Sequence, residues 1–317
     1  MKRLLISRFG ISNYMKLEEF TLPSPNVDQV VVEHELIGFN PVDYKIVEGS
    51  NLLSEKIAPF LPWTPGYDIC GRVTSVGPEC RHLKVGDRVC GMIGFPLRGG
   101  GYATHSLVTE TELVQIPEAL DARLALTCCL SGLTALEAYD FVSGPKRPLV
   151  ILGATGGVGV SLLGITRFHL HETFGTYRTP EGQRYLERTP GISGVDLQDL
   201  ASFFNQQSEV DVIDLVGGDL MISLLKAQAK KIRRLVTVPS FSSQLILTEA
   251  QKLRIEAKTF IVSPSVSRMG ELVRIMNDQT VSPEIGMVIS LEKVNEVFRI
   301  YQSGNVPGKI FIDPKKN

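Results

Sequence analysis

Short apolar runs separated by glycine and proline fill roughly the first 120 residues of the chain. The runs at 29–36, 71–76 and 88–93 have the length and the β-branched content of strands. The apolar stretch near Lys2 is short and is followed by Arg8, so it predicts a first strand and not a signal peptide. This pattern predicts a compact, mostly β domain.

From about Asp121 the pattern changes to helix-length stretches that alternate with apolar strands. Alternation of this kind predicts a parallel sheet covered by helices. After about Pro264 we expect an amphipathic stretch and a helix before one last strand, and we expect this tail to return to the first domain. The expected strands are 148–152, 173–177, 210–216, 234–238 and 309–312, and the tail's amphipathic stretch and helix are 269–277 and 291–302.

A glycine-rich turn follows the strand at 148–152. Gly156 lets the main chain approach a pyrophosphate, and Gly159 lets the helix expected over 158–168 pack close to the strand. The N-terminus of that helix adds partial positive charge. The turn therefore predicts a dinucleotide site, and its residues are Gly153, Ala154, Thr155, Gly156, Gly157, Val158 and Gly159.

The residues after the next strand indicate which cofactor is bound. An NAD-binding sheet usually carries Asp or Glu about twenty residues after the turn, where this chain has Arg178 and Thr179. A guanidinium forms charge-assisted bonds to a phosphate, which a carboxylate would repel. Arg178, with Thr179 and Arg184 beside it, predicts NADPH. The alternative is that Arg178 is a solvated surface residue.

Composition narrows the class of partner. The chain has 317 residues, 43% of them hydrophobic, and a formal net charge of -1. Without a basic patch we expect no nucleic-acid partner and no anionic membrane surface, and no apolar run reaches the length of a membrane span. An odd number of irregularly spaced cysteines favours free thiols in a reducing compartment, so we expect a cytoplasmic protein. The five are Cys70, Cys80, Cys90, Cys128 and Cys129.

Seven landmarks in order resemble the medium-chain dehydrogenase/reductase superfamily, in its zinc-independent quinone oxidoreductase and enone reductase branch. The resemblance covers nearly the whole chain. It implies an α/β fold: a GroES-like, mostly β catalytic domain of residues 1–122, completed by 265–317, and a Rossmann domain of 123–264 with a doubly wound parallel sheet that binds NADPH. It also implies a homodimer. The landmarks are Gly38–Lys45, Pro65–Gly71, Val85–Val89, Gly99–Ala103, Leu133–Ala135, Gly153–Gly159 and Val306–Ile310.

The chain departs from this pattern at the metal site. Zinc-dependent members of the superfamily carry a cysteine near Asn40 and Gly-His-Glu where this chain has Gly66, Tyr67 and Asp68. A lobe with four closely spaced cysteines, which a structural zinc requires, is missing too. We therefore expect no metal.

Two further departures concern glycines. Leu170 stands where many relatives have a glycine that ends the first Rossmann helix, and Arg233 stands where another often precedes a strand. We expect loop geometry to differ at these two places.

The resemblance implies the chemistry as well. Without zinc there is no Lewis acid for alcohol oxidation, so direct hydride transfer from NADPH to a quinone or an α,β-unsaturated carbonyl is the better hypothesis. Lys45 is the candidate that stabilises the acceptor oxygen, with Asp43 fixing the nearby geometry and Tyr44 as a weaker proton donor. Alternatively, Lys45 extends to solvent and Asp43 only caps a helix.

The expected cofactor contacts extend over both domains. Possible walls of the acceptor pocket are Tyr67, Phe95 and Phe241, any of which is equally compatible with a place in the core. Besides the turn at 153–158, the cofactor residues expected are Asn40, Thr134, Arg178, Thr179, Val216, Val238, Pro239, Phe241 and Lys309.

Two other functions remain open at this stage. An enoyl-CoA-type reductase would need a basic groove for the CoA phosphates, and the sequence has no clustered basic patch. An NADPH-binding redox sensor or structural protein without turnover would keep the glycine turn and could lose the Asn40–Lys45 segment, whereas this chain keeps both.

Overall fold

The chain folds into two compact units. The computed structural model describes residues 1–10, 15–144, 147–277, 285–302 and 308–316. The first unit comprises Met1–Ser131, Pro264–Asp278 and Ile285–Asn317, and the second comprises Gly132–Ser263. The division after Ser131 comes later in the chain than the boundary expected after residue 122, because α3 (Ala122–Thr127) packs against strands of the first unit.

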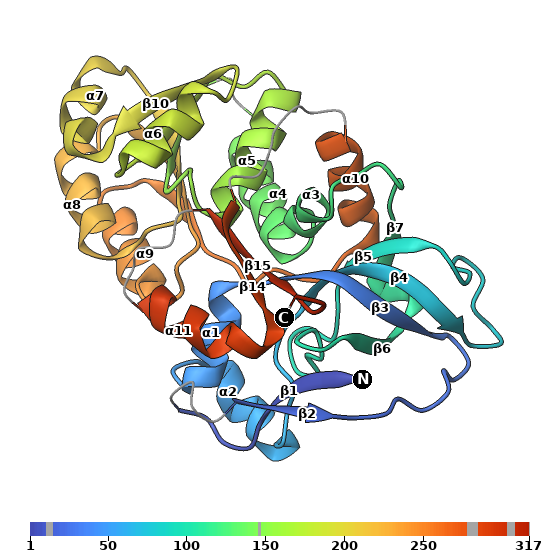
Figure 1. The fold of residues 1–317 in the computed structure, drawn as a ribbon. Coiled ribbons are helices and arrows are strands. Elements are labelled where there is room, and N and C mark those ends of the chain that lie inside the picture. Colours follow the sequence, from blue (N-terminus) through green and yellow to red (C-terminus); the bar gives the residue numbers. More distant parts are fainter. Residues whose placement is uncertain (11–14, 145–146, 278–284, 303–307, 317) are drawn as a thin grey trace. The chain divides into compact units, whose positions relative to one another are not determined.

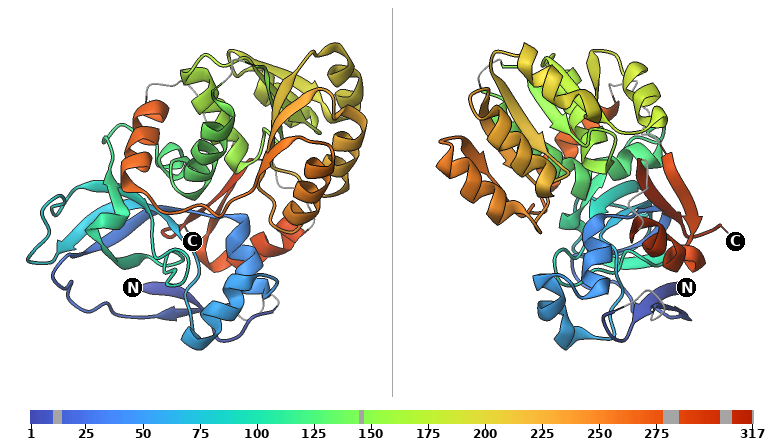
Figure 2. Two further views of the ribbon diagram at one scale, coloured as in Figure 1. Left: turned by 180° about the vertical axis from the view of Figure 1, so that it is seen from behind. Right: turned by 90° about the vertical axis from the view of Figure 1, so that its left-hand side faces the viewer.

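The first unit is built on a mostly antiparallel, seven-stranded sheet with the order β14-β15-β3-β4-β5-β7, in which β6 also pairs with β3. The C-terminal strands β14 and β15, red in Figure 1, lie beside β3, which is blue. Figure 2 shows them from two further sides. The strands are β3 (Gln29–Gly38), β4 (Asp68–Val76), β5 (Arg88–Met92), β6 (His105–Thr109), β7 (Leu113–Gln115), β14 (Ile285–Ser290) and β15 (Lys309–Asp313), and β1 (Lys2–Ile6) and β2 (Met15–Glu19) form a separate pair.

Most helices of the first unit are short. The helix expected over 291–302 begins instead with a 3₁₀ turn, Leu291–Lys293. The α-helices of this unit besides α3 are α1 (Pro41–Glu48), α2 (Leu52–Ile57), α10 (Val266–Asn277) and α11 (Val294–Gln302), and its other 3₁₀ turns are Ala58–Phe60 and Glu110–Glu112.

The second unit contains a six-stranded parallel sheet with the order β10-β9-β8-β11-β12-β13. The direction of winding reverses between β8 and β11, which is the place where open α/β sheets bind ligands at the carboxyl ends of their strands. The strand expected over 210–216 ends at Asp214, since a turn begins there. The strands are β8 (Leu149–Leu152), β9 (Thr173–Tyr177), β10 (Ile192–Asp196), β11 (Val210–Asp214), β12 (Ile232–Thr237) and β13 (Glu256–Lys258).

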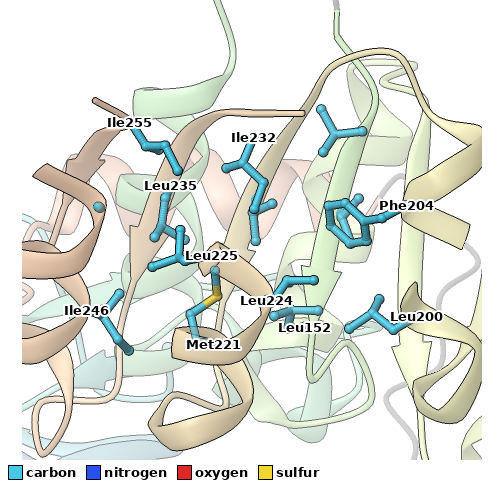
Figure 3. Close-up of a cluster of buried hydrophobic side chains, with 14 of the residues drawn as sticks. Leu152, Leu200, Phe204, Met221, Leu224, Leu225, Ile232, Leu235, Ile246 and Ile255 are labelled. Atoms are coloured by element: carbon cyan, nitrogen blue, oxygen red, sulfur yellow. The ribbon is translucent and has the colours of Figure 1, made fainter. Parts of the chain in front are cut away.

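The helices α7 (Leu200–Gln206), α8 (Gly218–Gln228) and α9 (Ser243–Lys252) cover one face of this sheet. Leu200 and Phe204 of α7, Met221 and Leu225 of α8 and Ile246 of α9 pack with sheet residues in one apolar cluster (Figure 3). Right-handed crossovers place helices after β8 on the opposite face from those after β11. The helices are α4 (Leu130–Val142), α5 (Gly157–Phe168), α6 (Pro180–Glu187), α7 (Leu200–Gln206), α8 (Gly218–Gln228) and α9 (Ser243–Lys252), with a 3₁₀ turn at Leu197–Asp199.

These observations confirm the expected α/β fold class, with a mostly β unit and a Rossmann-type parallel-sheet unit. Among the described residues, no helix combines the length and the apolar composition that crossing a bilayer requires.

The two glycine replacements have different structural consequences. Arg233 lies at a bulge of β12, where Val210 pairs with Ile232 and Asp211 pairs with Arg234. Leu170 keeps the left-handed backbone of a glycine, with φ 52°, so the turn after α5 retains that shape despite the leucine side chain. The Leu170 side chain is 92% exposed, so it buries little apolar surface that could offset the strain of the left-handed backbone.

We predict that Leu170→Gly stabilises the protein by about 1 kcal/mol. The left-handed conformation costs an L-residue about 1–2 kcal/mol, part of which the extra freedom of glycine in the unfolded chain cancels. Urea unfolding measures the gain. Leu170→Ala is the matched control, because alanine keeps the strained Cβ, and an equal gain in that variant would contradict the explanation.

Candidate functional site

The glycine turn of the second unit has the geometry of a phosphate cradle. Gly153 has φ +83°, and Gly156 is the N-cap of α5. A Cβ at Gly159 would lie 2.4 Å from the carbonyl oxygen of Ala154, so only glycine fits there. A Cβ at Gly156 would meet only the Gly153 carbonyl oxygen, at 3.5 Å, which leaves open space above the turn. The backbone can therefore approach a ligand closely.

The electrostatics of this turn suit an anion. The first turn of α5 carries no acidic residue, and the N–H groups at a helix start have no acceptor within the helix. The Gly153 N–H donates to the Thr176 hydroxyl at 2.9 Å, which ties the turn to β9. These residues fit the pyrophosphate of a dinucleotide.

Arg178 and Thr179 follow β9 directly and are exposed. Because β9 is parallel to β8 and pairs with it, Arg178 leaves the sheet at the same edge as the glycine turn. The Thr179 hydroxyl accepts from the Gly182 N–H at 3.2 Å and so caps α6. Arg184, the third residue expected near a phosphate, donates to Glu181 at 3.0 Å.

Asp214, at the end of β11, fixes the next turn along this edge, and sequence reasoning missed it. Its carboxylate accepts from the N–H groups of Val216 and Gly217, at 3.0 and 2.8 Å, and from the Thr237 hydroxyl at 2.8 Å. Burial raises the pKa of Asp214. An aspartate at the end of an apolar strand, before two glycines, was the available signal.

The remaining cofactor candidates of the second unit differ in exposure. Val216 and Phe241 are exposed, at 41% and 69%, whereas Val238 and Pro239 are half-buried. The exposure of Phe241 shows that it is no core residue of this unit. Thr134, on α4, is buried.

The candidate catalytic segment of the first unit starts at the N-cap of α1. Asn40 and Asp43 form a reciprocal capping box there, and the Asn40 N–H donates to Asp43 Oδ2 at 2.8 Å. The Tyr102 hydroxyl donates to the same oxygen at 3.0 Å, while buried Asp43 Oδ1 has no partner among the described residues. Burial raises the pKa of Asp43 to about 8. At neutral pH its carboxyl is therefore mostly protonated, and its role is to hold the start of the helix.

Lys45 and Tyr44 lie one turn further along α1. Lys45 is half-buried, and burial lowers its pKa, an effect that the nearby Glu48 partly offsets. The Tyr44 hydroxyl donates to Glu48 at 2.6 Å, and burial and Glu48 raise its pKa to about 12. Its ring packs against Phe298 and Tyr301. This geometry is contrary to the expected use of Tyr44 as a proton donor.

Lys309, expected at the cofactor, is the first residue of β15 and is 3% exposed. Its ammonium lies 3.0 Å from Asn40 Oδ1, 3.3 Å from Asp68 Oδ2 and 3.2 Å from Ser131 Oγ. All three partners are buried. Lys309 is thus a buried counter-charge. Residues 306 and 307 of its landmark lie outside the described residues.

The aromatic residues expected to line the acceptor pocket in the first unit differ in burial. Tyr67 is fully buried, its hydroxyl donates to the Pro96 carbonyl at 2.8 Å, and its ring centroid lies 5.0 Å from that of Phe95. Tyr67 is therefore part of the core, and Phe95 is half-buried. In the part of the chain that the structure describes, the cysteines are free thiols, and no three His, Cys, Asp or Glu side chains are placed to hold a metal ion.

We predict that Asp43→Asn changes how stability depends on pH. The folded chain holds the Asp43 proton up to about pH 8, whereas the unfolded chain releases it near pH 4. Asp43 therefore makes the folded state progressively less stable as pH rises through this window, by up to about 1.4 kcal/mol per pH unit, and asparagine abolishes that contribution. Urea unfolding from pH 5 to 9 should show the variant gaining on the wild type as pH rises.

Tyr102→Phe is the matched control for this experiment. It deletes one hydrogen bond to Asp43 and keeps the carboxyl, so its difference from the wild type should lack the steep rise with pH. Parallel pH curves for the wild type and Asp43→Asn would contradict a raised pKa at Asp43.

Comparisons with known proteins agree with this architecture. Residues 26–118 match the alcohol dehydrogenase GroES-like domain, and residues 195–312 match the zinc-binding dehydrogenase family. The chain is 31% identical to the quinone oxidoreductase of Sus scrofa over 235 residues, which is 71% of this chain and 66% of that protein. It is 26% identical to the chloroplastic quinone oxidoreductase QR1 of Triphysaria versicolor, over 95% of this chain and 94% of that one.

Solved structures share the fold over nearly the whole length. The quinone oxidoreductase of Coxiella burnetii has a TM-score of 0.89 at 23% identity, with 99% of both chains covered. That of Escherichia coli, solved in complex with NADPH, has a TM-score of 0.82 at 18% identity, with 99% of this chain and 100% of the other covered. By its landmarks, its two units and these relatives, the chain belongs to the medium-chain dehydrogenase/reductase superfamily, in the quinone oxidoreductase branch.

Proposed function

We propose that this protein is an NADPH-dependent reductase of quinones or α,β-unsaturated carbonyl compounds that works without zinc. The observation that carries the proposal is the edge of the second unit, where an open glycine cradle and Arg178 follow neighbouring parallel strands. A pyrophosphate and a second, separate phosphate are the groups that such an edge attracts. NADPH carries both.

The preference for NADPH over NADH rests on charge. Arg178 stands after β9, where an acid would bind the ribose hydroxyls of NADH, and Thr179 follows it at the start of α6. Arg178 directly follows β9, whereas Arg184 lies within α6 and donates to Glu181, so Arg178 is the first of the two arginines to test.

Lys45 supports the acceptor chemistry. Bound NADPH supplies a hydride, and a quinone or enone that receives it develops negative charge on its oxygen. The half-buried Lys45 ammonium is positioned on a helix whose start is held by Asn40 and Asp43. A partly desolvated ammonium stabilises an oxyanion more strongly than a solvated one does. The lowered pKa of Lys45 also favours its transfer of a proton to that oxygen.

The residues at the metal positions of zinc-dependent relatives support a reaction without zinc. Tyr67 stands at one position, and its hydroxyl already donates to the Pro96 carbonyl. Asn40 and Asp68 stand at the others, and both are bound to the Lys309 ammonium. A cation of the chain itself therefore occupies the oxygen ligands that a metal would need.

We predict that Lys45→Ala lowers kcat/KM for the acceptor by about a hundredfold, which is typical for the loss of one oxyanion donor. NADPH oxidation by chelator-treated protein, with a small benzoquinone and a short-chain enone in parallel, measures the effect. The faster acceptor identifies the subclass.

Lys56→Ala is the matched control, because Lys56 is an exposed lysine on α2, and we expect a change of less than about twofold. Turnover that disappears on chelation and returns with zinc would refute the zinc-free reaction. Saturable NADPH binding without turnover of either acceptor would favour the sensor hypothesis.

We predict that Arg178→Ala raises the KM for NADPH by about 10- to 100-fold and changes the KM for NADH little. The loss corresponds to charge-assisted bonds worth about 1.5–3 kcal/mol. The matched control is Arg233→Ala, an exposed arginine near the amino end of β12, at the opposite edge of the sheet. Equal losses for both cofactors in Arg178→Ala would show that Arg178 does not bind the phosphate that distinguishes them.

A further inference from the structure

The Lys309 ammonium has one oxygen acceptor for each of its three N–H groups. These acceptors are Asn40 Oδ1, Asp68 Oδ2 and Ser131 Oγ, at 3.0 to 3.3 Å. The Asp68 carboxylate is fully buried, and its second oxygen accepts the Leu130 N–H at 3.0 Å. The charges are thus paired and hydrogen-bonded, as burial of an ion pair requires.

This ion pair decides how the Asn40 side chain is turned. Asn40 Oδ1 faces the ammonium of Lys309, and Asn40 Nδ2 donates to Asp68 Oδ2 at 2.8 Å. Rotating the amide by half a turn would place its NH₂ group against the ammonium and its oxygen against the carboxylate. Both contacts would be repulsive in a buried environment. The amide therefore has one allowed orientation.

The packing of β3 makes room for this arrangement. A Cβ on Gly38 would lie 2.9 Å from Asp68 Cβ and 3.3 Å from Lys309 Cε. Any larger residue at 38 would displace the ion pair, two residues before Asn40. The arrangement thus depends on three segments that are distant in sequence, β3, β4 and β15.

We infer that Lys309 is a positioning residue that acts through Asn40. Together with Asp68 it fixes the Asn40 carboxamide, so that the second N–H of Asn40 Nδ2 has a set direction for a carbonyl oxygen of the bound ligand. The inference rests on the proposed function, in which that oxygen belongs to the nicotinamide carboxamide or to the acceptor. Of the two N–H groups on Nδ2, the described hydrogen bonds use one, to Asp68.

The test uses a neutral replacement of the pair. Lys309→Met alone leaves Asp68 buried without a counter-charge and is expected to unfold more readily. Lys309→Met with Asp68→Asn removes both charges and keeps an acceptor for the Leu130 N–H. Either orientation of Asn40 can then bond to the new asparagine, so its orientation is no longer fixed. We expect this double variant to recover most of the stability and still to lose about tenfold in kcat/KM, the loss of one well-placed hydrogen bond.

Coupling to Asn40 separates positioning from a merely structural role. Asn40→Ser keeps a capping oxygen and removes the carboxamide. In that background the neutral pair should cause little further loss of kcat/KM, so the effects are not additive. Multiplicative losses would overturn the inference. The dissociation constant of NADPH, compared between the neutral-pair variant and the wild type, shows which oxygen Asn40 binds. It rises in the variant if Asn40 binds the nicotinamide carboxamide, and it stays constant if Asn40 binds the acceptor.

A second, partly buried ion pair provides the matched control. Arg147 Nε donates to Oδ1 of the buried Asp211 at 3.1 Å. The pair lies near the amino ends of β8 and β11, away from the glycine turn. Arg147→Met with Asp211→Asn makes the same chemical change, and we expect less than about a twofold effect on kcat/KM. An effect as large as that of the Lys309 pair would reduce the Lys309 result to general destabilisation and overturn the inference.

A readout without turnover keeps the inference separate from the proposed function. The Asn40 side-chain NH₂ signals, identified by their loss in Asn40→Ser, should be protected from hydrogen exchange in the wild type and lose protection in the neutral-pair variant. Unchanged protection would overturn the positioning role even if the enzyme is active. A wild type that reduces neither acceptor would overturn the proposed function alone.

Discussion

The ion pair between Lys309 and Asp68 holds the polar centre of the first unit. It joins the first residue of β15 to the first residue of β4, and through Asn40 it reaches the start of α1. Removing one partner of such a pair costs far more than the pair contributes, because a bare charge then remains buried. The position of the candidate catalytic helix therefore depends on a lysine that the C-terminal tail contributes.

Burial also sets the protonation of the neighbouring groups. With Lys309 balancing Asp68, a second ionised carboxylate at Asp43 would leave the centre with uncompensated negative charge. The raised pKa of Asp43 keeps it mostly neutral at neutral pH, so it accepts bonds from Asn40 and Tyr102 without that cost. Charge and hydrogen bonding thus fix the geometry around Asn40, at the start of the helix that carries Lys45.

The second unit obtains its binding edge from backbone geometry. Gly159 permits the close contact between α5 and the turn, and Asp214 holds the following turn by accepting backbone N–H groups. The first arrangement directs the N–H dipoles at the start of α5 toward the carboxyl edge of the sheet, whereas the second uses the N–H groups of Val216 and Gly217 to bind Asp214 itself. An anion binds well at such an edge because the donors are already in place and need no reordering.

The sequence by itself determined the features that local physics controls. Apolar periodicity predicted β9 and most other strands to within a few residues, and the glycine turn predicted the start of α5, because both depend on neighbouring residues. Only the tertiary structure decided that Lys309 is buried, that the Tyr44 ring packs against Phe298 and Tyr301, and that Tyr67 belongs to the core. These outcomes depend on burial and on partners from distant segments. Lys309 and Asn40 are 269 positions apart, and no local pattern encodes which distant charge a buried amine will meet.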